Sequence, residues 1–420
     1  MTAPPASLKD AAWLREGPLA RLLAVLDRDG EEARVVGGAV RNALLGEPIV
    51  EFDVATTAGP GEVIRRVAAA GFKPVPTGID HGTVTVVIDS RPFEVTTLRQ
   101  DVETFGRHAS VRFGRDWRAD AERRDFTMNA LSVGTDGVVH DTVGGIADLQ
   151  ARRVRFIGDP QKRIAEDYLR ILRFFRFHAA YGHGLPDAAG LHACIAGRAG
   201  LAQLSRERVR MELLKLLLAP HATPALAAMA ESGLLVLVLG GVPDLAGFEN
   251  MAKVEASAGV QADAVQRLGA LAARIPEDAE RLAQRLRLSN AEHGRLKSMS
   301  DAWWQLTPAN EKGARALLYR LGAERFVDRV LLGWSRSWPR SSRAVQDDAW
   351  RALAMLPERW AIPVFPLKAA DFMKRGVARG PALGAAMHEA EAAWIAADFP
   401  AEPEAVAAIA AAAAAEVRPM

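Results

Sequence analysis

The chain has 420 residues, of which 49% are hydrophobic and 25% are charged, a balance typical of folded globular proteins with two or three domains. Its net charge of only +2 means that any binding to nucleic acid must depend on local basic clusters. A single cysteine, Cys194, excludes a disulfide framework and a cysteine-based zinc site, and the lack of a long apolar run excludes a membrane span; both favour a cytoplasmic location.

A strand followed directly by a helix is predicted near the N-terminus, at residues 33–36 and 39–45. Two glycines, Gly37 and Gly38, stand between them and let the backbone approach a ligand closely. The N-terminus of the helix offers free N–H groups that favour an anion, and Arg41 lies in its first turn. Gly38 and Arg41 are therefore candidate phosphate-binding residues.

Two acidic residues follow on the next predicted strand. Glu51 and Asp53 alternate with Phe52, so both carboxylates are expected on one face of the strand. Such a pair is repulsive unless a cation lies between the two groups. We expect Glu51 and Asp53 to be catalytic residues that hold two Mg²⁺ ions, which could activate an attacking hydroxyl and stabilise a leaving pyrophosphate.

The remaining strand signals are also found early in the chain. Segments 84–88 and 93–97 flank a turn and predict a hairpin. Glu94 lies on the opposite face from Phe93, where it is either a third catalytic acid near the metals or an ordinary surface acid. Short strands are expected at 138–140 and 154–157, and the glycine-containing, highly charged segment 100–120 is expected to be a mobile loop.

One amphipathic helix is predicted over residues 161–181. On it Asp167 and Arg170 are i,i+3 neighbours. An acceptor beside a fork of donors complements the amino group and ring nitrogen of adenine and cytosine, whereas guanine and uracil have the reverse order. The alternative is a helical salt bridge. Eight Lys or Arg residues in segment 150–176 add a basic cluster suited to triphosphate or RNA.

Beyond residue 160 nearly every pattern is helical. The predicted helices include 206–218, 262–275, 279–286 and 314–321. The patterns together predict an α+β protein, with a small mixed-sheet domain followed by an all-helical region.

The ordered motifs of this sequence resemble those of class II tRNA nucleotidyltransferases and poly(A) polymerases, most of all the bacterial CCA-adding enzymes. The motifs that carry the resemblance are Gly37-Gly-Ala-Val-Arg41, Glu51-Phe-Asp53, His81-Gly-Thr-Val-Thr-Val86, segment 93–99, Arg123-Arg-Asp-Phe-Thr-Met-Asn129, Glu166-Asp167 and segment 205–213.

The resemblance implies a domain organisation. An N-terminal extension (1–20) would precede a nucleotidyltransferase head (21–150). A helical neck with the nucleobase-recognition helix and an RNA-binding region (151–245) would follow, and then a helical body and tail that contact tRNA (246–420).

The resemblance also implies roles for individual residues. Arg124 would contact phosphate, and Asp125 and Asn129 would help to recognise the sugar hydroxyls. Asp167 and Arg170 would read the base, with support from Arg173 and Arg176. Two positions depart from the family: Glu51 stands where Asp is usual, and Asn42 where many relatives have Asp.

The expected activity is template-independent addition or repair of the 3′-terminal CCA of tRNA, with CTP and ATP as substrates. A poly(A) polymerase with the same head is the nearest alternative, and a non-catalytic tRNA-binding protein is suggested by Glu51. An enzyme that adds only the two cytidines would lack a full-length loop, but segment 100–120 is present. The sequence does not indicate an oligomeric state.

Overall fold

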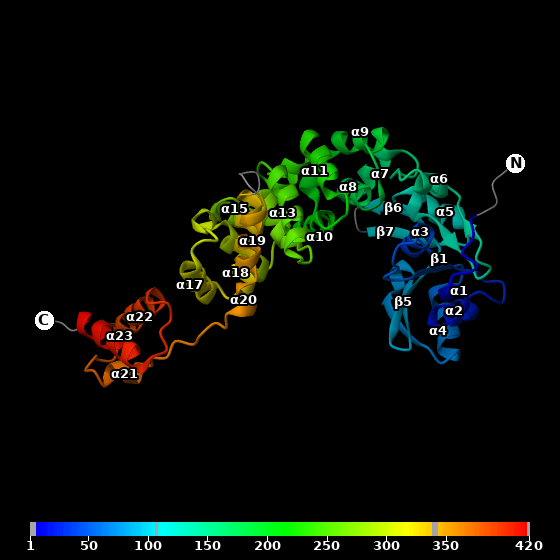
Figure 1. Ribbon diagram of the computed structural model, residues 1–420. Coiled ribbons are helices and arrows are strands. Elements are labelled where there is room, and N and C mark those ends of the chain that lie inside the picture. The colour runs from blue at the N-terminus through cyan, green and yellow to red at the C-terminus, as the bar shows by residue number, and fades with distance from the viewer. Residues whose placement is uncertain (1–5, 106–107, 338–342, 418–420) are drawn as a thin grey trace. The chain divides into compact units, whose positions relative to one another are not determined.

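The structure is a computed structural model that describes residues 6–105, 108–337 and 343–417, with side chains described outside 100–112 and 338–346. It divides into two compact units, Met1–Val238 and Leu239–Met420, which we describe separately (Figure 1). Within the described ranges, no helix has the length and apolarity needed to cross a membrane. The predicted boundaries at residues 20, 150 and 245 stay predictions.

The first unit contains a seven-stranded mixed sheet in the order β3-β4-β5-β2-β1-β8-β9. Every neighbouring pair is antiparallel except β2 with β5, which is parallel. The strands are β1 (Ala33–Val36), β2 (Asp53–Thr56), β3 (Lys73–Gly78), β4 (Thr83–Ile88), β5 (Arg91–Thr97), β8 (Ser132–Val133) and β9 (Val139–His140). The hairpin predicted for β4 and β5 and the strand predicted at 138–140 are confirmed.

The two faces of this sheet differ in chemistry because successive side chains of a strand point to opposite faces. Val54, Val84 and Val95 are fully buried on one face, which is covered by α2 (Pro18–Leu26) and α4 (Pro60–Ala69). The opposite face carries Asp53 and Glu94, beside each other in the β2–β5 register. The apolar face packs against the helices, and the face with Asp53 and Glu94 is not covered by them.

Two predictions about strands and loops in this unit are wrong in detail. Segment 100–120 is not an irregular loop: it contains an antiparallel pair, β6 (Arg99–Phe105) with β7 (His108–Phe113), and then α5 (Trp117–Glu122). Residues 154–157 form no strand, because only Phe156 makes a bridge, to Phe126.

The helices of the first unit are α1 (Ala12–Arg15), α2, α3 (Gly38–Leu45), α4, α5, α6 (Gly145–Gln150), α7 (Pro160–Glu166), α8 (Leu169–Tyr181), α9 (Ala188–Ala196), α10 (Arg206–Leu217), α11 (Ala222–Glu231) and α12 (Leu234–Leu239), which includes the division point; three short 3₁₀ turns are η1 (Ile79–His81), η2 (Thr127–Asn129) and η3 (Arg198–Gln203).

The single helix predicted over residues 161–181 is wrong, because the chain breaks it at Asp167. The backbone there is extended, with φ −155° and ψ 106°. The Asp167 carboxylate accepts a hydrogen bond from the backbone N–H of Leu169 at 3.1 Å and so satisfies a free donor at the start of α8. The apolar periodicity continues across the break, which is why the pattern alone predicts one helix.

Helix α8 is held by aromatic packing. Its Phe174 and Phe175 are fully buried, and Phe174 stacks on Phe156 with ring centroids 5.4 Å apart. The helix also packs on α10 and α11. The polar side of α8 is thereby fixed next to the segment that follows α5.

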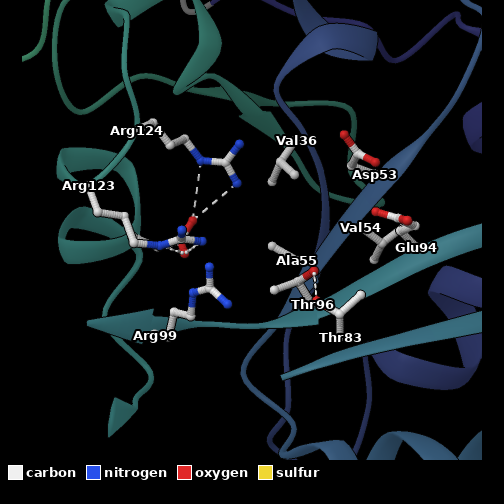
Figure 2. Close-up of a pocket in the computed structure, with 11 residues that line it drawn as sticks. Val36, Asp53, Val54, Ala55, Thr83, Glu94, Thr96, Arg99, Arg123 and Arg124 are labelled. Carbon is white, nitrogen blue, oxygen red and sulfur yellow. Dashed lines mark hydrogen bonds and ion pairs between the residues drawn. The ribbon is translucent and has the colours of Figure 1, made fainter. Parts of the chain in front are cut away.

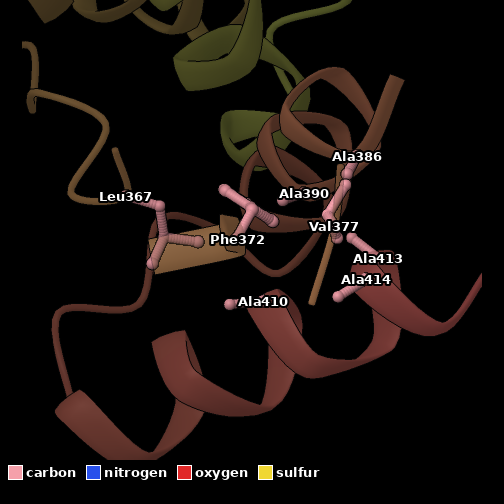
Figure 3. Close-up of a cluster of buried hydrophobic side chains, with 8 residues drawn as sticks. All are labelled: Leu367, Phe372, Val377, Ala386, Ala390, Ala410, Ala413 and Ala414. Atoms are coloured by element: carbon pink, nitrogen blue, oxygen red, sulfur yellow. The ribbon is translucent and has the colours of Figure 1, made fainter. Parts of the chain in front are cut away.

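The second unit has only helices among its described residues. They are α13 (Leu245–Ala258), α14 (Ala264–Ala272), α15 (Pro276–Leu286), α16 (Asn290–Ser300), η4 (Trp303–Gln305), α17 (Glu311–Leu321), α18 (Ala323–Ser337), α19 (Arg343–Ala354), α20 (Leu356–Arg359), α21 (Ala369–Met373), α22 (Pro381–Ala396) and α23 (Pro403–Glu416). Its core includes the fully buried Phe248, Leu268, Leu296 and Phe326. Figure 3 shows a separate cluster, in which alanines of α22 and α23 pack around Phe372.

Candidate active site

A cavity of about 230 Å³ lies over the polar face of the sheet. Asp53 and Glu94 are at one side, and Arg99, Arg123 and Arg124 are at the other (Figure 2). The pairing of Asp53 with Glu94 across two strands brings together two acids that are distant in sequence. Glu51 is not on the strand, as the alternation predicted, but on the segment just before β2.

The acidic side of the cavity carries a local excess of negative charge. Partial desolvation, then the charges of Glu51 and Glu94, raise the pKa of Asp53, and Arg124 only partly opposes them. Glu51 and Glu94 therefore both lie near enough to Asp53 to influence its carboxylate. A cation at this place would relieve their repulsion.

The donor set suits a hard divalent cation. Carboxylate oxygens are the ligands that Mg²⁺ prefers, and Mg²⁺ is usually held by one or two carboxylates together with substrate phosphates. Within the described parts of the chain, no group of three or more His, Cys, Asp or Glu side chains forms a complete metal site by itself. The acids fit a metal that is completed by a substrate.

The basic side of the cavity is arranged by Asp120, which is 3% exposed. Its carboxylate accepts from Arg123 at 2.7 Å and from Arg124 at 3.2 Å. Gly37 has a φ of +69°, and a Cβ there would lie 3.3 Å from Arg124. The glycine thus permits both the turn before α3 and the close approach of this arginine.

Arg41 does not face the cavity in the way its position in the first turn of α3 predicted. It is 6% exposed and donates to the side chain of Asn129 and, at 2.7 Å, to the hydroxyl of Tyr181. Its guanidinium lies 4.0 Å from the Tyr181 ring centroid. Burial lowers the pKa of Arg41. In this structure Arg41 joins α3 to α8, while Gly38 begins α3 beside it.

Asp125 and Asn129 continue this network. The Asn129 amide donates to Asp125 at 3.0 Å, and Arg173 donates to the other oxygen of Asp125 at 2.7 Å. Burial alone would raise the pKa of Asp125, but the charge of Arg173 and these hydrogen bonds hold it below its ordinary value. Asp125 is therefore a buried link to α8 that is charged at neutral pH.

The base-reading pair predicted from sequence is arranged differently. Asp167 pairs with Arg208 of α10 at 2.6 Å, and Arg170 pairs with Glu166 at 2.5 Å. The expected placement of both residues on one helix is wrong, because Asp167 lies in the break between α7 and α8. Each of the two side chains is oriented by a separate partner.

Arg173 and Arg176 are both fixed by a residue that the sequence argument did not single out. Glu212 of α10, only 2% exposed, pairs with Arg176 at 2.5 Å and with Arg173 at 3.6 Å. Glu212 and Arg208 both belong to the motif at 205–213. The motif could have indicated that Glu212 and Arg208 are functional residues. The spacing of residues along the chain could not show that they pair with Arg173, Arg176 and Asp167.

Comparison with known proteins supports the family suggested by these features. Two family profiles match the chain: "Poly A polymerase head domain" at residues 33–155 and "Probable RNA and SrmB- binding site of polymerase A" at residues 191–247. The first covers the sheet with its cavity, and the second begins in α9 and includes α10.

Full-length relatives extend the match. The chain is 33% identical over 403 residues to the mitochondrial CCA tRNA nucleotidyltransferase 1 of Danio rerio, covering 90% of this chain and 86% of the relative. It is 33% identical to a CCA-adding enzyme of Limosilactobacillus fermentum, with 88% and 90% covered. The crystal structure of the Bacillus stearothermophilus CCA-adding enzyme in complex with CTP superposes with a TM-score of 0.74 at 28% identity, over 93% of this chain and 95% of that one. The chain therefore belongs to the family of CCA-adding tRNA nucleotidyltransferases.

Proposed function

We propose that this protein adds or repairs the 3′-terminal CCA of tRNA, using CTP and ATP and releasing pyrophosphate. The observation that carries the proposal is the cavity in which Asp53 and Glu94 face Arg123 and Arg124, in a chain that matches CCA-adding relatives over nearly its whole length. A nucleotidyl transfer needs negative groups for metal ions and positive groups for a triphosphate, and the cavity provides both.

Each side of the cavity has a role in this proposal. Asp53 and Glu51 would hold two Mg²⁺ ions, with Glu94 as a further acid beside Asp53. When bound, the metal ions would lower the cost of charge on the attacking and leaving oxygens. Arg124, oriented by Asp120, would hold the triphosphate over the N-terminus of α3, whose backbone N–H groups favour an anion.

Asp125, Asn129 and Arg41 would serve the nucleotide as one unit. The hydrogen bonds from Tyr181 through Arg41 and Asn129 to Asp125 would keep the ribose side of the site rigid. A preorganised site loses little free energy to reorganisation during the reaction.

Base selection would depend on Asp167 and Arg170. A carboxylate offers about four acceptor positions, so Asp167 can accept from an amino group while Arg208 holds it. Arg170 has more donors than its bonds to Glu166 and the carbonyl of Arg163 use. The two partners would set the angle between the acceptor and the donor that read cytosine and adenine.

The activity can be tested directly. Purified protein is incubated with Mg²⁺, each labelled nucleotide and a tRNA that ends before its CCA. We expect the addition of C, C and A and then a stop. Long A-tracts from ATP alone on an unstructured RNA would indicate a poly(A) polymerase, and tRNA binding without incorporation would indicate the non-catalytic alternative suggested by Glu51. Removal of Mg²⁺ with a chelator should stop incorporation. The cytoplasmic location expected from the sequence stays a prediction.

A further inference from the structure

A second cavity, of about 530 Å³, lies within the helical second unit and has no part in the site described above. It is lined by residues of α13, η4, α18 and α19, and by Asp244 and Arg274 outside these helices. The lining includes Trp303, Trp304, Arg336 and Trp350. Aromatic and cationic side chains thus meet in one hollow that is far along the sequence from the acidic residues of the sheet.

The cavity contains buried donors that have no acceptor. Arg336 donates from Nη2 to the carbonyl of Ala273, but its Nε and Nη1 atoms and the indole Nε1 of Trp350 are buried without a hydrogen-bond partner. Trp350 is 4% exposed. This absence of acceptors holds for the part of the chain that the structure describes. Guanidinium and indole groups can only donate. A ligand that satisfies them must be rich in acceptors.

Arg336 also has no direct ion pair with a described acid, although Asp244 and Asp278 partly offset its charge from a distance. Its guanidinium lies 4.3 Å from the Trp303 ring centroid, and among the described residues it has no ion-pair partner. Asp244, the nearest lining acid, is paired with Arg274 at 2.7 Å, and Asp278 is paired with Arg281. Burial and then the charge of Arg274 lower the pKa of Arg336 to about 10, so it stays cationic at neutral pH. An anion is the ligand that this group lacks.

An aromatic surface lies beside this anion position. Trp304 is 56% exposed and lines the same cavity, edge to face with Trp303. Exposed aromatic rings next to arginine are the usual means by which proteins hold single-stranded nucleic acid, since every base has a face that can stack. Gly333 keeps the hollow open to Trp350, because a Cβ there would lie 3.2 Å from its ring.

We propose that this cavity binds one nucleotide of the RNA substrate, with a phosphate on Arg336 and Trp350 and the base on Trp304. The proposal rests on the proposed RNA substrate. It gives the helical second unit a defined contact, separate from the site where nucleotides are transferred.

The test compares variants in binding to fluorescently labelled tRNA that lacks CCA. Arg336→Gln and Trp304→Ala should each weaken the affinity by roughly fivefold to a hundredfold. They should raise the KM for tRNA while leaving the KM for CTP and the kcat of the first addition unchanged. Arg325→Gln is the matched control, because Arg325 lies exposed on the same helix outside the cavity and should bind like the wild type.

Three outcomes would overturn the proposal. One is wild-type tRNA affinity in either cavity variant. Another is a lower melting temperature in both variants with an unchanged KM for tRNA, which would mean that these residues are only structural. The third comes from tryptophan fluorescence. A short single-stranded RNA should quench this fluorescence in the wild type and not in Arg336→Gln. Equal quenching by CMP or by inorganic phosphate would overturn the proposal and assign the cavity to a free metabolite. Because the quenching needs no catalysis, a wild-type protein that adds no nucleotide would refute the proposed function without deciding this one.

Discussion

Two aspartates of the first unit lie in opposite electrostatic surroundings, one beside other acids and one beside an arginine. Asp53, on the polar face of the sheet, is next to Glu94 and near Glu51, and its pKa is raised. Asp125, beside α8, is paired with Arg173, and its pKa is lowered. On the sheet, the negative charge of Asp53 lies beside other acids, at the place where we propose that a cation and a triphosphate bind. Around α8, by contrast, the buried acids Asp125 and Glu212 are both paired with arginines of that helix.

The largest expected effect follows from removing the unpaired charge. Asp53→Asn should reduce nucleotide incorporation on the order of 10³-fold, because several kcal/mol of metal-dependent charge stabilisation would be lost. Glu51→Asp is the control and should retain activity. Steady-state incorporation of labelled CTP measures both variants, and near wild-type activity of Asp53→Asn would disprove the metal assignment.

The same variant should not lose stability. Because the folded-state pKa of Asp53 is raised, its ionised form weakens folding at neutral pH, and this penalty disappears below the unfolded pKa of ~3.9. Asp53→Asn should therefore melt at or above the wild-type temperature at pH 7. Mg²⁺ should raise the melting temperature of the wild type more than that of the variant.

Breaking the paired charge should have the opposite consequence. Asp125→Asn removes the closer of the two acidic partners of Arg173, which keeps Glu212 at 3.6 Å. The free energy of unfolding should fall by about 1.5–3 kcal/mol, as expected for the loss of hydrogen bonds between charged groups. The folded-state pKa of Asp125 is lowered, so its contribution is present above the unfolded pKa of ~3.9 and is lost as the pH falls through the folded value. Urea unfolding at pH 7 and under acidic conditions measures this. A stability difference that does not shrink with acid would contradict the ion-pair explanation.

A smaller effect is expected at the break between α7 and α8. Asp167→Ala should narrow the preference for CTP over UTP by roughly tenfold to a hundredfold, as expected for the loss of a bidentate base contact worth ~1–3 kcal/mol. Arg208→Ala should narrow it in the same direction, since Arg208 orients Asp167. The measurement is the ratio of kcat/KM for the two nucleotides. An unchanged ratio with a lowered melting temperature would mean that Asp167 and Arg208 form only a structural salt bridge.

The smallest effect concerns the link from α3 to α8. Tyr181→Phe removes one hydrogen bond to Arg41 but keeps the ring below its guanidinium. The free energy of unfolding should fall by about 1 kcal/mol. Thermal unfolding of Tyr181→Phe and Tyr181→Leu separates the hydroxyl from the ring, and equal values for both would mean that the ring contributes nothing.

The sequence predicted what depends on local pattern. Alternation on β5 put Glu94 opposite the buried Phe93, and the structure brings it beside Asp53. The mixed-sheet domain and the change to helices followed from residue patterns, and the family followed from the order of the motifs. The roles assigned to individual site residues stay predictions until the variants are made.

Long-range pairing was beyond the reach of local pattern. The partner of Asp167 is 41 residues away, and Glu212 is 36 residues from Arg176. Arg41 was expected to be open to phosphate because it follows two glycines, but the burial that Tyr181 and Asn129 impose on it depends on how α8 folds back. The spacing of residues along the chain does not reveal which of these distant residues come into contact in the folded protein.

The alanine-rich packing of α22 and α23 has a consequence for the order in which the protein opens. Ala386, Ala390, Ala410 and Ala413 let the two helices approach closely, but a methyl group buries little apolar area, and stabilisation scales with that area at ~25 cal/mol per Å². Regions with such weak burial open by local unfolding before the rest of a chain. Backbone amides of α23 should therefore exchange with deuterium well before those of the phenylalanine-rich α8.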